Sequence, residues 1–163
     1  MTSKISFSLL GNPNCGKTAI FNLLTGLNQK VANHPGITVE KKISEIRLNS
    51  NIKMEIEDFP GTYSIIPQSL DEQIVSSTIL KWKKNPTEKP DGIIYVADIN
   101  NLRQNMFFLT QLLPFDIPII LLLNMVDLTS KNIINTDLLK QNTGIYKIIP
   151  FSATKRVGLN TLN

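Results

Sequence analysis

The sequence predicts an α/β fold, in which a mostly parallel sheet of six strands, with one antiparallel edge strand, carries helices on both faces. Two observations indicate this class. Strands and amphipathic segments alternate along the second half of the chain, which is typical of parallel strands joined by crossover helices. Two of those strands, Gly92–Ala97 and Ile117–Leu123, are almost continuously apolar, as strands covered on both faces must be. A length of 163 residues with 42% hydrophobic residues fits one domain with a sizeable core.

The first half of the chain is expected to contribute three strands and two helices. In order, these are a strand at Ile5–Leu10, a helix that includes Ile20 and ends near Gly26, a loop at Asn28–Thr38, strands at Val39–Leu48 and Ile52–Glu57, a loop at Asp58–Gln68, and a helix from Ser69 to about Lys83. Apolar residues at i, i+1, i+3, i+4 and i+7 from Ile20 define the first helix. The short polar turn after Leu48 makes the second and third strands antiparallel partners. Ser69 and Glu72 form a capping box at the start of the second helix.

The second half continues as alternating strands and helices. These are a strand at Gly92–Ala97, a helix at Asn101–Leu113, a strand at Ile117–Leu123, a helix at about Thr136–Thr143, a strand at Ile148–Phe151, and the start of a helix at Val157–Leu162. The last helix stops within about two turns, although a sheet of this type needs it to cover one face. We therefore expect residues 1–163 to be one domain, a fragment of a longer protein.

Composition and charge limit the function without deciding it. The longest apolar run is too short to cross a bilayer, and Met1–Lys4 lacks the layout of a signal peptide. A single cysteine agrees with a reducing compartment, so we expect a soluble cytoplasmic domain. The net charge is +4, and its one basic cluster, Lys81, Lys83 and Lys84, fits a solvated helix end as well as a nucleic acid or an anionic membrane. We expect no nucleic-acid partner.

A phosphate-binding loop follows the first strand. Gly11-Asn12-Pro13-Asn14-Cys15-Gly16-Lys17-Thr18 matches the pattern G-x-x-x-x-G-K-[ST] between a strand and a helix. Gly11 and Gly16 let the backbone curl so that successive N–H groups point at a phosphate, and the helix N-terminus adds its dipole. Lys17 is expected to reach the β- and γ-phosphates, and the Thr18 hydroxyl to bind Mg²⁺. The alternative is a glycine-rich turn with a surface lysine.

Three further segments at strand ends indicate which nucleotide binds. Asp58-Phe59-Pro60-Gly61 places a carboxylate where P-loop enzymes hold Mg²⁺, and the Gly61 N–H where it can meet the γ-phosphate. Asn124-Met125-Val126-Asp127 offers a carboxylate that accepts two hydrogen bonds from guanine, whereas adenine lacks both donors. Ser152-Ala153-Thr154 offers a backbone N–H for guanine O6. Each signal is weak alone, but their order along one sheet edge favours a guanine nucleotide.

The same motifs carry a family resemblance. GNPNCGKT, DFPG, NMVD and SAT, together with Pro35-Gly36-Ile37-Thr38-Val39-Glu40, resemble the G1 to G5 boxes of translation-factor-related GTPases and, more narrowly, the bacterial ferrous iron transporter B family, FeoB. The resemblance implies a Ras-like P-loop GTPase fold, nucleotide contacts from Gly36 to Glu40, and Mg²⁺ ligation by Thr38 in the GTP state. It implies that the chain binds GTP and GDP as a cytoplasmic switch that regulates Fe²⁺ transport across the bacterial inner membrane. The implied partners are the helical and transmembrane permease domains of the same full-length chain, and a small cytoplasmic Feo protein.

The resemblance also implies a route for hydrolysis. Where many such GTPases have a glutamine, this chain has Thr62, which is too short to orient water, and no arginine lies in either switch loop. In potassium-activated GTPases an asparagine at the position of Asn14 holds K⁺. We therefore expect slow, K⁺-stimulated hydrolysis. The expected catalytic set is Asn14, Lys17, Thr38 and Gly61. The alternative for Asn14 is that it only satisfies hydrogen bonds of the loop.

Two other functions stay open. A ribosome-assembly GTPase would use the basic charge for RNA, although such proteins usually carry a lysine where this chain has Met125. A nucleotide-gated binding module without catalysis is the second, because the water-orienting glutamine is missing. Without the lysine stem that stacks over the base, we expect modest nucleotide affinity and fast release in any of these functions.

Overall fold

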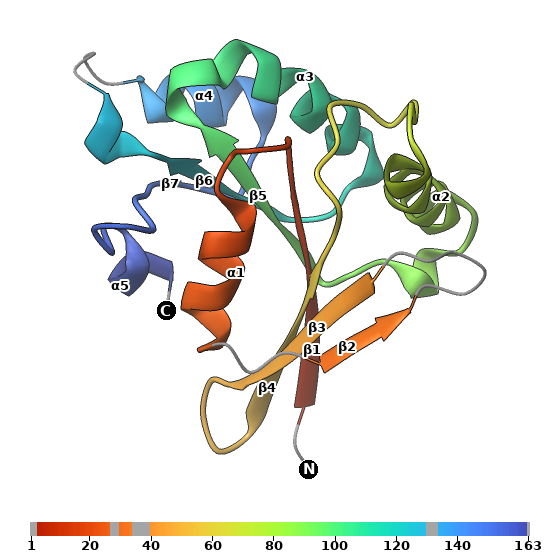
Figure 1. The fold of residues 1–163 in the computed structure, drawn as a ribbon. Coiled ribbons are helices and arrows are strands. Elements are labelled where there is room, and N and C mark those ends of the chain that lie inside the picture. The colour runs from red at the N-terminus through yellow and green to blue at the C-terminus, as the bar shows by residue number, and fades with distance from the viewer. Residues whose placement is uncertain (1–2, 27–29, 34–39, 130–133, 163) are drawn as a thin grey trace.

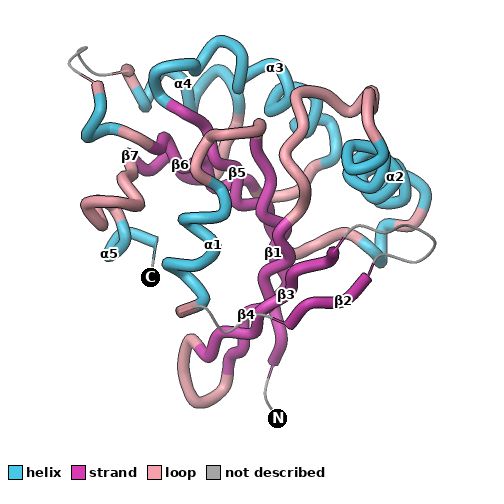
Figure 2. Tube along the Cα trace, viewed as in Figure 1, coloured by secondary structure: helices cyan, strands magenta, loops and turns pink. Residues whose placement is uncertain are grey.

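A single sheet runs through the middle of the protein, with helices on both of its faces (Figures 1 and 2). The computed structural model describes residues 3–26, 30–33, 40–129 and 134–162. Its strands are β1 (Ser3–Gly11), β2 (Lys30–Asn33), β3 (Glu40–Arg47), β4 (Ile52–Asp58), β5 (Gly92–Asp98), β6 (Ile119–Asn124) and β7 (Lys147–Pro150). They lie in the order β2-β3-β4-β1-β5-β6-β7. The predicted α/β class, with a mostly parallel sheet between helices, is confirmed.

One strand of the sheet was not predicted. β2 lies inside the segment expected to be a loop, and it pairs antiparallel with β3. β3 also pairs antiparallel with β4, whereas β1, β4, β5, β6 and β7 are joined by parallel pairs. The described sheet therefore has seven strands, and its antiparallel strand is next to the edge. Four residues are too few to show a two-residue alternation, and their pairing with β3 uses backbone groups that every sequence has.

The helices fall where the apolar spacing predicts them. They are α1 (Lys17–Thr25), α2 (Leu70–Lys84), α3 (Leu102–Leu112), α4 (Thr136–Thr143) and α5 (Leu159–Leu162), with 3₁₀ turns η1 (Pro86–Glu88), η2 (Ile99–Asn101), η3 (Leu113–Phe115) and η4 (Val126–Leu128). The predicted cap of α2 is present, because Ser69 Oγ accepts a hydrogen bond from Glu72 N at 3.2 Å. The Glu72 carboxylate accepts in turn from Gln68 N at 2.6 Å, one residue before the expected donor. Among the described helices, none is both long and apolar enough to span a membrane.

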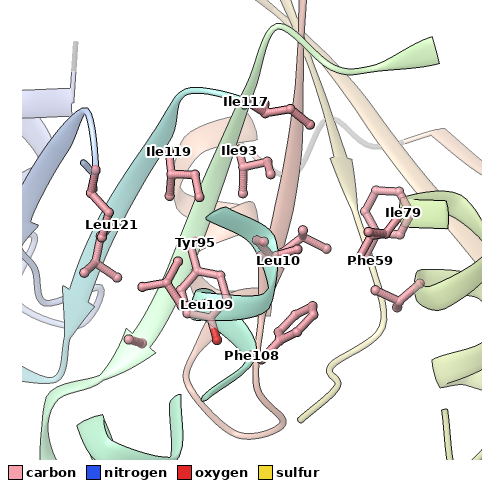
Figure 3. Close-up of a cluster of buried hydrophobic side chains, with 14 of the residues drawn as sticks. Leu10, Phe59, Ile79, Ile93, Tyr95, Phe108, Leu109, Ile117, Ile119 and Leu121 are labelled. Carbon is pink, nitrogen blue, oxygen red and sulfur yellow. The ribbon is translucent and has the colours of Figure 1, made fainter. Parts of the chain in front are cut away.

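Two apolar clusters hold the layers together. On one face α2 and α3 pack against the sheet through residues such as Ile79 and Leu109, and Figure 3 shows Leu109 beside Tyr95 of β5 and Ile79 beside Phe59. On the other face α1 contributes Ile20 and Phe21. Both faces of the central strands are therefore covered, which explains why β5 and β6 are almost wholly apolar.

The face that carries α1 and α5 also holds an apolar hollow. Its volume is about 720 Å³, and its walls include Phe7, Leu24, Ile120 and Leu162. The expectation that residues of a longer chain cover this face stays a prediction.

Candidate nucleotide-binding site

The carboxyl ends of the parallel strands meet at one edge of the sheet, and the predicted site residues gather there. β1 ends at Gly11, and α1 begins at Lys17, so the phosphate-binding loop spans the turn between them (Figure 1). Within it, Asn14 and Gly16 adopt left-handed backbone conformations, with φ of 62° and 88°. Such left-handed residues curl a loop so that its N–H groups face one concave side, which suits an anion. The curled loop predicted from the glycines is thus present.

Gly16 is also required by its neighbour. A Cβ atom there would lie 2.3 Å from Asn124 Nδ2, a distance that side chains do not tolerate. The Asn124 side chain, from the end of β6, comes this close because it bonds the loop backbone. Its Nδ2 donates to the Cys15 carbonyl oxygen at 2.9 Å. Gly16 is therefore needed for the shape of the loop and also for the contact between the loop and the segment at the end of β6.

The two charges expected to act on phosphate and on metal lie in contact. Lys17 Nζ is 2.5 Å from Asp58 Oδ1. Both side chains are largely buried, with exposed fractions of 10% and 6%. Thr18, in the first turn of α1, is exposed beside them. The ammonium and the carboxylate thus come from two motifs, 41 positions apart in the chain, that meet in a direct contact. The metal-binding role of the Thr18 hydroxyl stays a prediction.

The segment after β4 packs directly against the phosphate-binding loop. A Cβ atom on Gly61 would lie 2.9 Å from both N and Cα of Pro13. Thr62 N donates to the Gly11 carbonyl oxygen at 3.2 Å, and Phe59 is buried in the core. Pro60, between Phe59 and Gly61, is half-buried. The absence of a side chain at Gly61 is what lets the two loops approach.

Thr62 does not face a reaction centre. It is fully buried, and its hydroxyl donates to the Ser64 carbonyl oxygen at 2.8 Å and accepts from Ser64 N at 3.3 Å. The hydroxyl is therefore engaged in a local turn. This agrees with the expectation that Thr62 does not replace a water-orienting glutamine.

The base-recognition segments are joined by Asn124. Its Oδ1 accepts from Ala153 N at 3.3 Å, while its Nδ2 holds the phosphate-binding loop. Val126 N donates to the Phe151 carbonyl oxygen at 3.2 Å, which fastens the turn after β6 to the end of β7. Met125 takes a left-handed conformation with φ of 66°, and Asp127 is exposed.

The third predicted segment, residues 152–154, has one buried and one exposed end. Ser152 is fully buried, and its hydroxyl accepts from Lys155 N at 3.0 Å. Ala153 is half-buried with its N–H already bonded to Asn124, and Thr154 is exposed. The exposed Asp127 carboxylate and this turn therefore lie at neighbouring strand ends, where a base would be read.

Cys15 lies inside the loop but points into the core. Its side chain is 1% exposed and packs in the cluster below α1. Burial raises the pKa of the Cys15 thiol to about 11, because a thiolate would be poorly solvated there. The residue therefore contributes backbone to the site and a small apolar side chain to the core.

Part of the predicted site lies outside the described residues. Gly36, Ile37, Thr38 and Val39 belong to that part, and Glu40 is described only as the first residue of β3. The contacts of these residues with nucleotide and the ligation of Mg²⁺ by Thr38 stay predictions.

Sequence reasoning missed a group of buried polar side chains beneath the loop. Tyr95 in β5 and Asn105 in α3 are 0% and 3% exposed. The Tyr95 hydroxyl bonds Asn12 Oδ1 and the Asn105 carbonyl oxygen, and Asn105 Oδ1 accepts from Asp98 N at the end of β5. A signal was available. Tyr95 is the one residue with a hydroxyl in a strand that is otherwise apolar up to Asp98, and a buried tyrosine hydroxyl needs a partner. Asn105 has a low helix propensity, yet it lies in the middle of the amphipathic helix α3.

The fold and the edge just described define a class of protein, the P-loop GTPase domains. A sequence profile of the family described as "Ferrous iron transport protein B" matches residues 5–163. The chain belongs to that family and corresponds to its N-terminal G domain.

Individual relatives agree with the family profile. The chain is 40% identical over 156 residues to the Fe(2+) transporter FeoB of Leptospira biflexa, covering 94% of this chain and 22% of the relative. It is 38% identical over 159 residues to FeoB of Legionella pneumophila, covering 94% and 20%. The chain thus spans about a fifth of the length of these curated relatives.

Structures of relatives show the same fold. The crystal structure of the G domain of the T. maritima FeoB iron transporter is 35% identical, with a TM-score of 0.85, and the match covers 98% of this chain and 94% of that one. An S. thermophilus NFeoB mutant bound to GDP is 37% identical with a TM-score of 0.85, covering 98% of this chain and 59% of that one. The cytosolic domain of L. pneumophila FeoB is 37% identical with a TM-score of 0.85, covering 96% and 66%.

Proposed function

We propose that this chain is a guanine-nucleotide switch: it binds GTP and GDP, hydrolyses GTP, and in a longer protein regulates Fe²⁺ transport across the bacterial inner membrane from the cytoplasmic face. The observation that carries the proposal is the contact between Lys17 and Asp58, since it unites the phosphate-binding loop with the acidic segment of a GTPase. The relatives named as Fe(2+) transporters support the iron function, and the GDP-bound relative supports the nucleotide.

The phosphate end of the site is built from backbone and one cation. The curled loop offers its N–H groups, α1 offers the positive end of its dipole, and Lys17 offers a charge to the β- and γ-phosphates. Because Lys17 bonds Asp58, phosphate binding must redirect the ammonium from one oxygen anion to another. Asp58 would then lose its cation, and a bound Mg²⁺ would compensate its charge.

The part of the site that would contact the base provides selectivity for guanine. Asp127 accepts hydrogen bonds from the N1–H and exocyclic amine of guanine, and an adenine in the same place would leave the carboxylate without donors. The turn at residues 152–154 offers backbone N–H groups to the guanine O6. Asn124 holds this end in register with the phosphate loop, because it bonds both segments.

The residues present fit two cations. Mg²⁺ would be held by the Thr18 hydroxyl and the Asp58 carboxylate, hard oxygen ligands at the mouth of the loop, together with Thr38, and it would neutralise phosphate charge when bound. K⁺ would be held by Asn14, whose side chain is exposed, and would supply positive charge where no arginine does. No hydrogen bond joins the Asn14 side chain to another described residue, so within the described chain the loop-stabilising alternative has no partner for it.

The chain's own groups around the γ-phosphate are few. Gly61 lies against the phosphate-binding loop, where its N–H would meet the γ-phosphate, and the Thr62 hydroxyl bonds within its own turn. Water must therefore be oriented by backbone groups of the switch segments, which predicts slow hydrolysis. Met125 lies over the loop, with its Cε 3.7 Å from the position of a Cβ on Gly16. It replaces a longer aliphatic stem, and we expect GDP to be held with micromolar rather than nanomolar affinity.

Binding is tested by titrating the chain with fluorescent GDP and fluorescent ADP in Mg²⁺. GDP is expected to bind and ADP is not, and Lys17→Ala is expected to abolish binding of GDP. Lys140→Ala, an exposed lysine of α4 far from the loop in sequence, is the matched control and should bind like the wild type. Equal binding of ADP and GDP would contradict the assigned role of Asp127.

Catalysis is tested by phosphate release from GTP in K⁺ and in Na⁺. Stimulation by K⁺ that is lost in Asn14→Ala supports the proposed chemistry. Equal slow rates in both salts, with intact GDP binding, would instead support a nucleotide-sensing module that lacks catalysis of its own. The iron function is tested in the full-length protein, where Lys17→Ala should reduce uptake of Fe²⁺ by cells without lowering the amount of protein in the membrane.

A further inference from the structure

A buried polar contact ties the phosphate-binding loop to the sheet beneath it. The Tyr95 hydroxyl lies 2.6 Å from the Asn105 carbonyl oxygen and 3.1 Å from Asn12 Oδ1, and its single proton is shared between these two acceptors. Tyr95 and Asn12 are only 0% and 2% exposed. Asn12 Nδ2 donates to the Gln104 carbonyl oxygen at 3.4 Å. Both ends of the Asn12 amide are therefore bonded to helix α3, one directly and one through Tyr95.

The part of α3 that receives these bonds is itself held in place. Asn105 Nδ2 donates to the Asn101 carbonyl oxygen at 2.8 Å, and Asn105 Oδ1 accepts from Asp98 N at 3.3 Å. The first bond fixes the side chain along the helix, and the second joins it to the end of β5. The support beneath Asn12 is thus anchored at both the helix and the sheet.

The far end of α3 holds the segment after Asp58-Phe59-Pro60-Gly61. Gln111 Oε1 accepts a hydrogen bond from Ile65 N at 2.8 Å, and Ile65 packs on the same apolar cluster. Gly61, directly before that segment, approaches Pro13, the residue after Asn12. One helix therefore contacts both the phosphate-binding loop and the segment that follows Gly61.

We propose that Tyr95 is a positioning residue for nucleotide binding: through its hydroxyl it fixes Asn12, and with it the first half of the phosphate-binding loop, against α3. The inference rests on the proposed function. Tyr95 touches no nucleotide and acts only through Asn12. In the described chain no other donor reaches Asn12 Oδ1, so loss of the hydroxyl leaves a buried acceptor unpaired next to the loop.

The ring and the hydroxyl of Tyr95 have separable roles. The ring packs against Phe108 with centroids 5.8 Å apart, and in Figure 3 it lies among aliphatic side chains of β5, β6 and α3. Burial raises the pKa of the hydroxyl, which therefore stays protonated and remains a donor at neutral pH. Tyr95→Phe keeps the ring packing and removes only the hydrogen bond, so it isolates the positioning role.

The experiment measures the rate at which fluorescent GDP leaves the protein, together with KM and kcat for GTP. Tyr95→Phe is expected to release GDP about tenfold faster and to raise KM more than it lowers kcat, because the affected group shapes binding. Asn12→Ala should have a similar effect. The double variant should be little worse than either single variant, since both remove the same link.

Two controls separate positioning from loss of stability. Tyr146→Phe removes a hydroxyl that is exposed on the surface and should release GDP like the wild type. Ile79→Val removes one methyl group from the buried face of α2, lowers the midpoint of unfolding, and should also leave the release rate unchanged. All rates are compared at a temperature where circular dichroism shows every variant folded.

The outcomes are distinct. If the wild type does not bind fluorescent GDP in the equilibrium titration, the proposed function fails and the role of Tyr95 fails with it. If the wild type retains GDP and Tyr95→Phe releases it at the wild-type rate, only the role of Tyr95 is refuted. If Tyr95→Phe and Asn12→Ala each accelerate release but their effects multiply, the tyrosine does not act through Asn12 and the inference is wrong.

Discussion

Replacing Asn124 with alanine should cost the protein a large part of its stability. The side chain is 3% exposed and makes two hydrogen bonds, from Nδ2 to the Cys15 carbonyl oxygen at 2.9 Å and from Ala153 N to Oδ1 at 3.3 Å. Asn124→Ala removes both bonds and leaves two backbone groups to find other partners. Each bond is worth about 1 kcal/mol net, and an unpaired buried group costs ~1–3 kcal/mol, so the expected loss is roughly 2–4 kcal/mol.

The assay is urea unfolding followed by circular dichroism, with Asn142→Ala as the matched control. Asn142 is an exposed residue of α4, so its replacement should change the free energy of unfolding by less than about 0.5 kcal/mol. For a domain of this size, a loss of 2–4 kcal/mol corresponds to a fall in Tm of roughly 4–16 °C. A loss below about 1 kcal/mol in Asn124→Ala would refute the reasoning, because it would mean that the two backbone groups are satisfied without Asn124.

Two more predictions concern the loop itself. Gly61→Ala should weaken GTP binding and hydrolysis more than GDP binding, measured by phosphate release and fluorescent-nucleotide titration, because its Cβ would meet Pro13 at 2.9 Å; unchanged turnover would contradict this close approach. Cys15 should give the wild type a steeper loss of stability at high pH than Cys15→Ala has. Burial raises the folded pKa of the thiol from 9.0 to about 11, so its contribution is complete below pH 9 and is lost as the pH rises towards 11. Parallel stability curves for the two proteins over that range would show that the thiol is solvated.

The parts of the site that were predicted from sequence are those in which local chemistry fixes local shape. The loop from Gly11 to Thr18 needs glycines at set places, and its position between a strand and a helix follows from hydrophobic spacing alone. The contact between Lys17 and Asp58 then follows from topology. Both residues stand at the carboxyl edge of parallel strands that turn out to be neighbours, β1 and β4.

The parts that were missed depend on contacts between distant segments. β2 is a strand because β3 lies beside it, and nothing in its four residues specifies that pairing. Tyr95 reads as one more residue of a buried strand until the structure places Asn12 and α3 around its hydroxyl. For Asn124, the motif marks the position, but its bond to the Cys15 carbonyl oxygen requires knowing that β6 ends beside the loop. Hydrophobic periodicity indicates which face of a helix or strand is buried. It does not indicate which polar atom of another element lies against that face.

These contacts divide the site into a fixed part and a part that carries chemistry. Three contacts hold the loop: Asn124 at the end of β6, Tyr95 in the middle of β5 through Asn12, and the close approach of Gly61 in the segment after β4. All three contacts are made on the protein side of the loop, and none uses the exposed side chains of Asn14 or Thr18.

The division has a measurable consequence. Removing one of these contacts makes the phosphate-binding loop less rigid in both the GTP and the GDP state. It should therefore change the rate of nucleotide release without changing which cation stimulates hydrolysis. Changing Asn14 should do the reverse, because that side chain lies on the solvent side of a loop whose shape is set elsewhere. A variant of Tyr95 that lost the response to K⁺ while keeping the wild-type rate of GDP release would break this division, since it would show that these contacts shape the chemistry and not the binding.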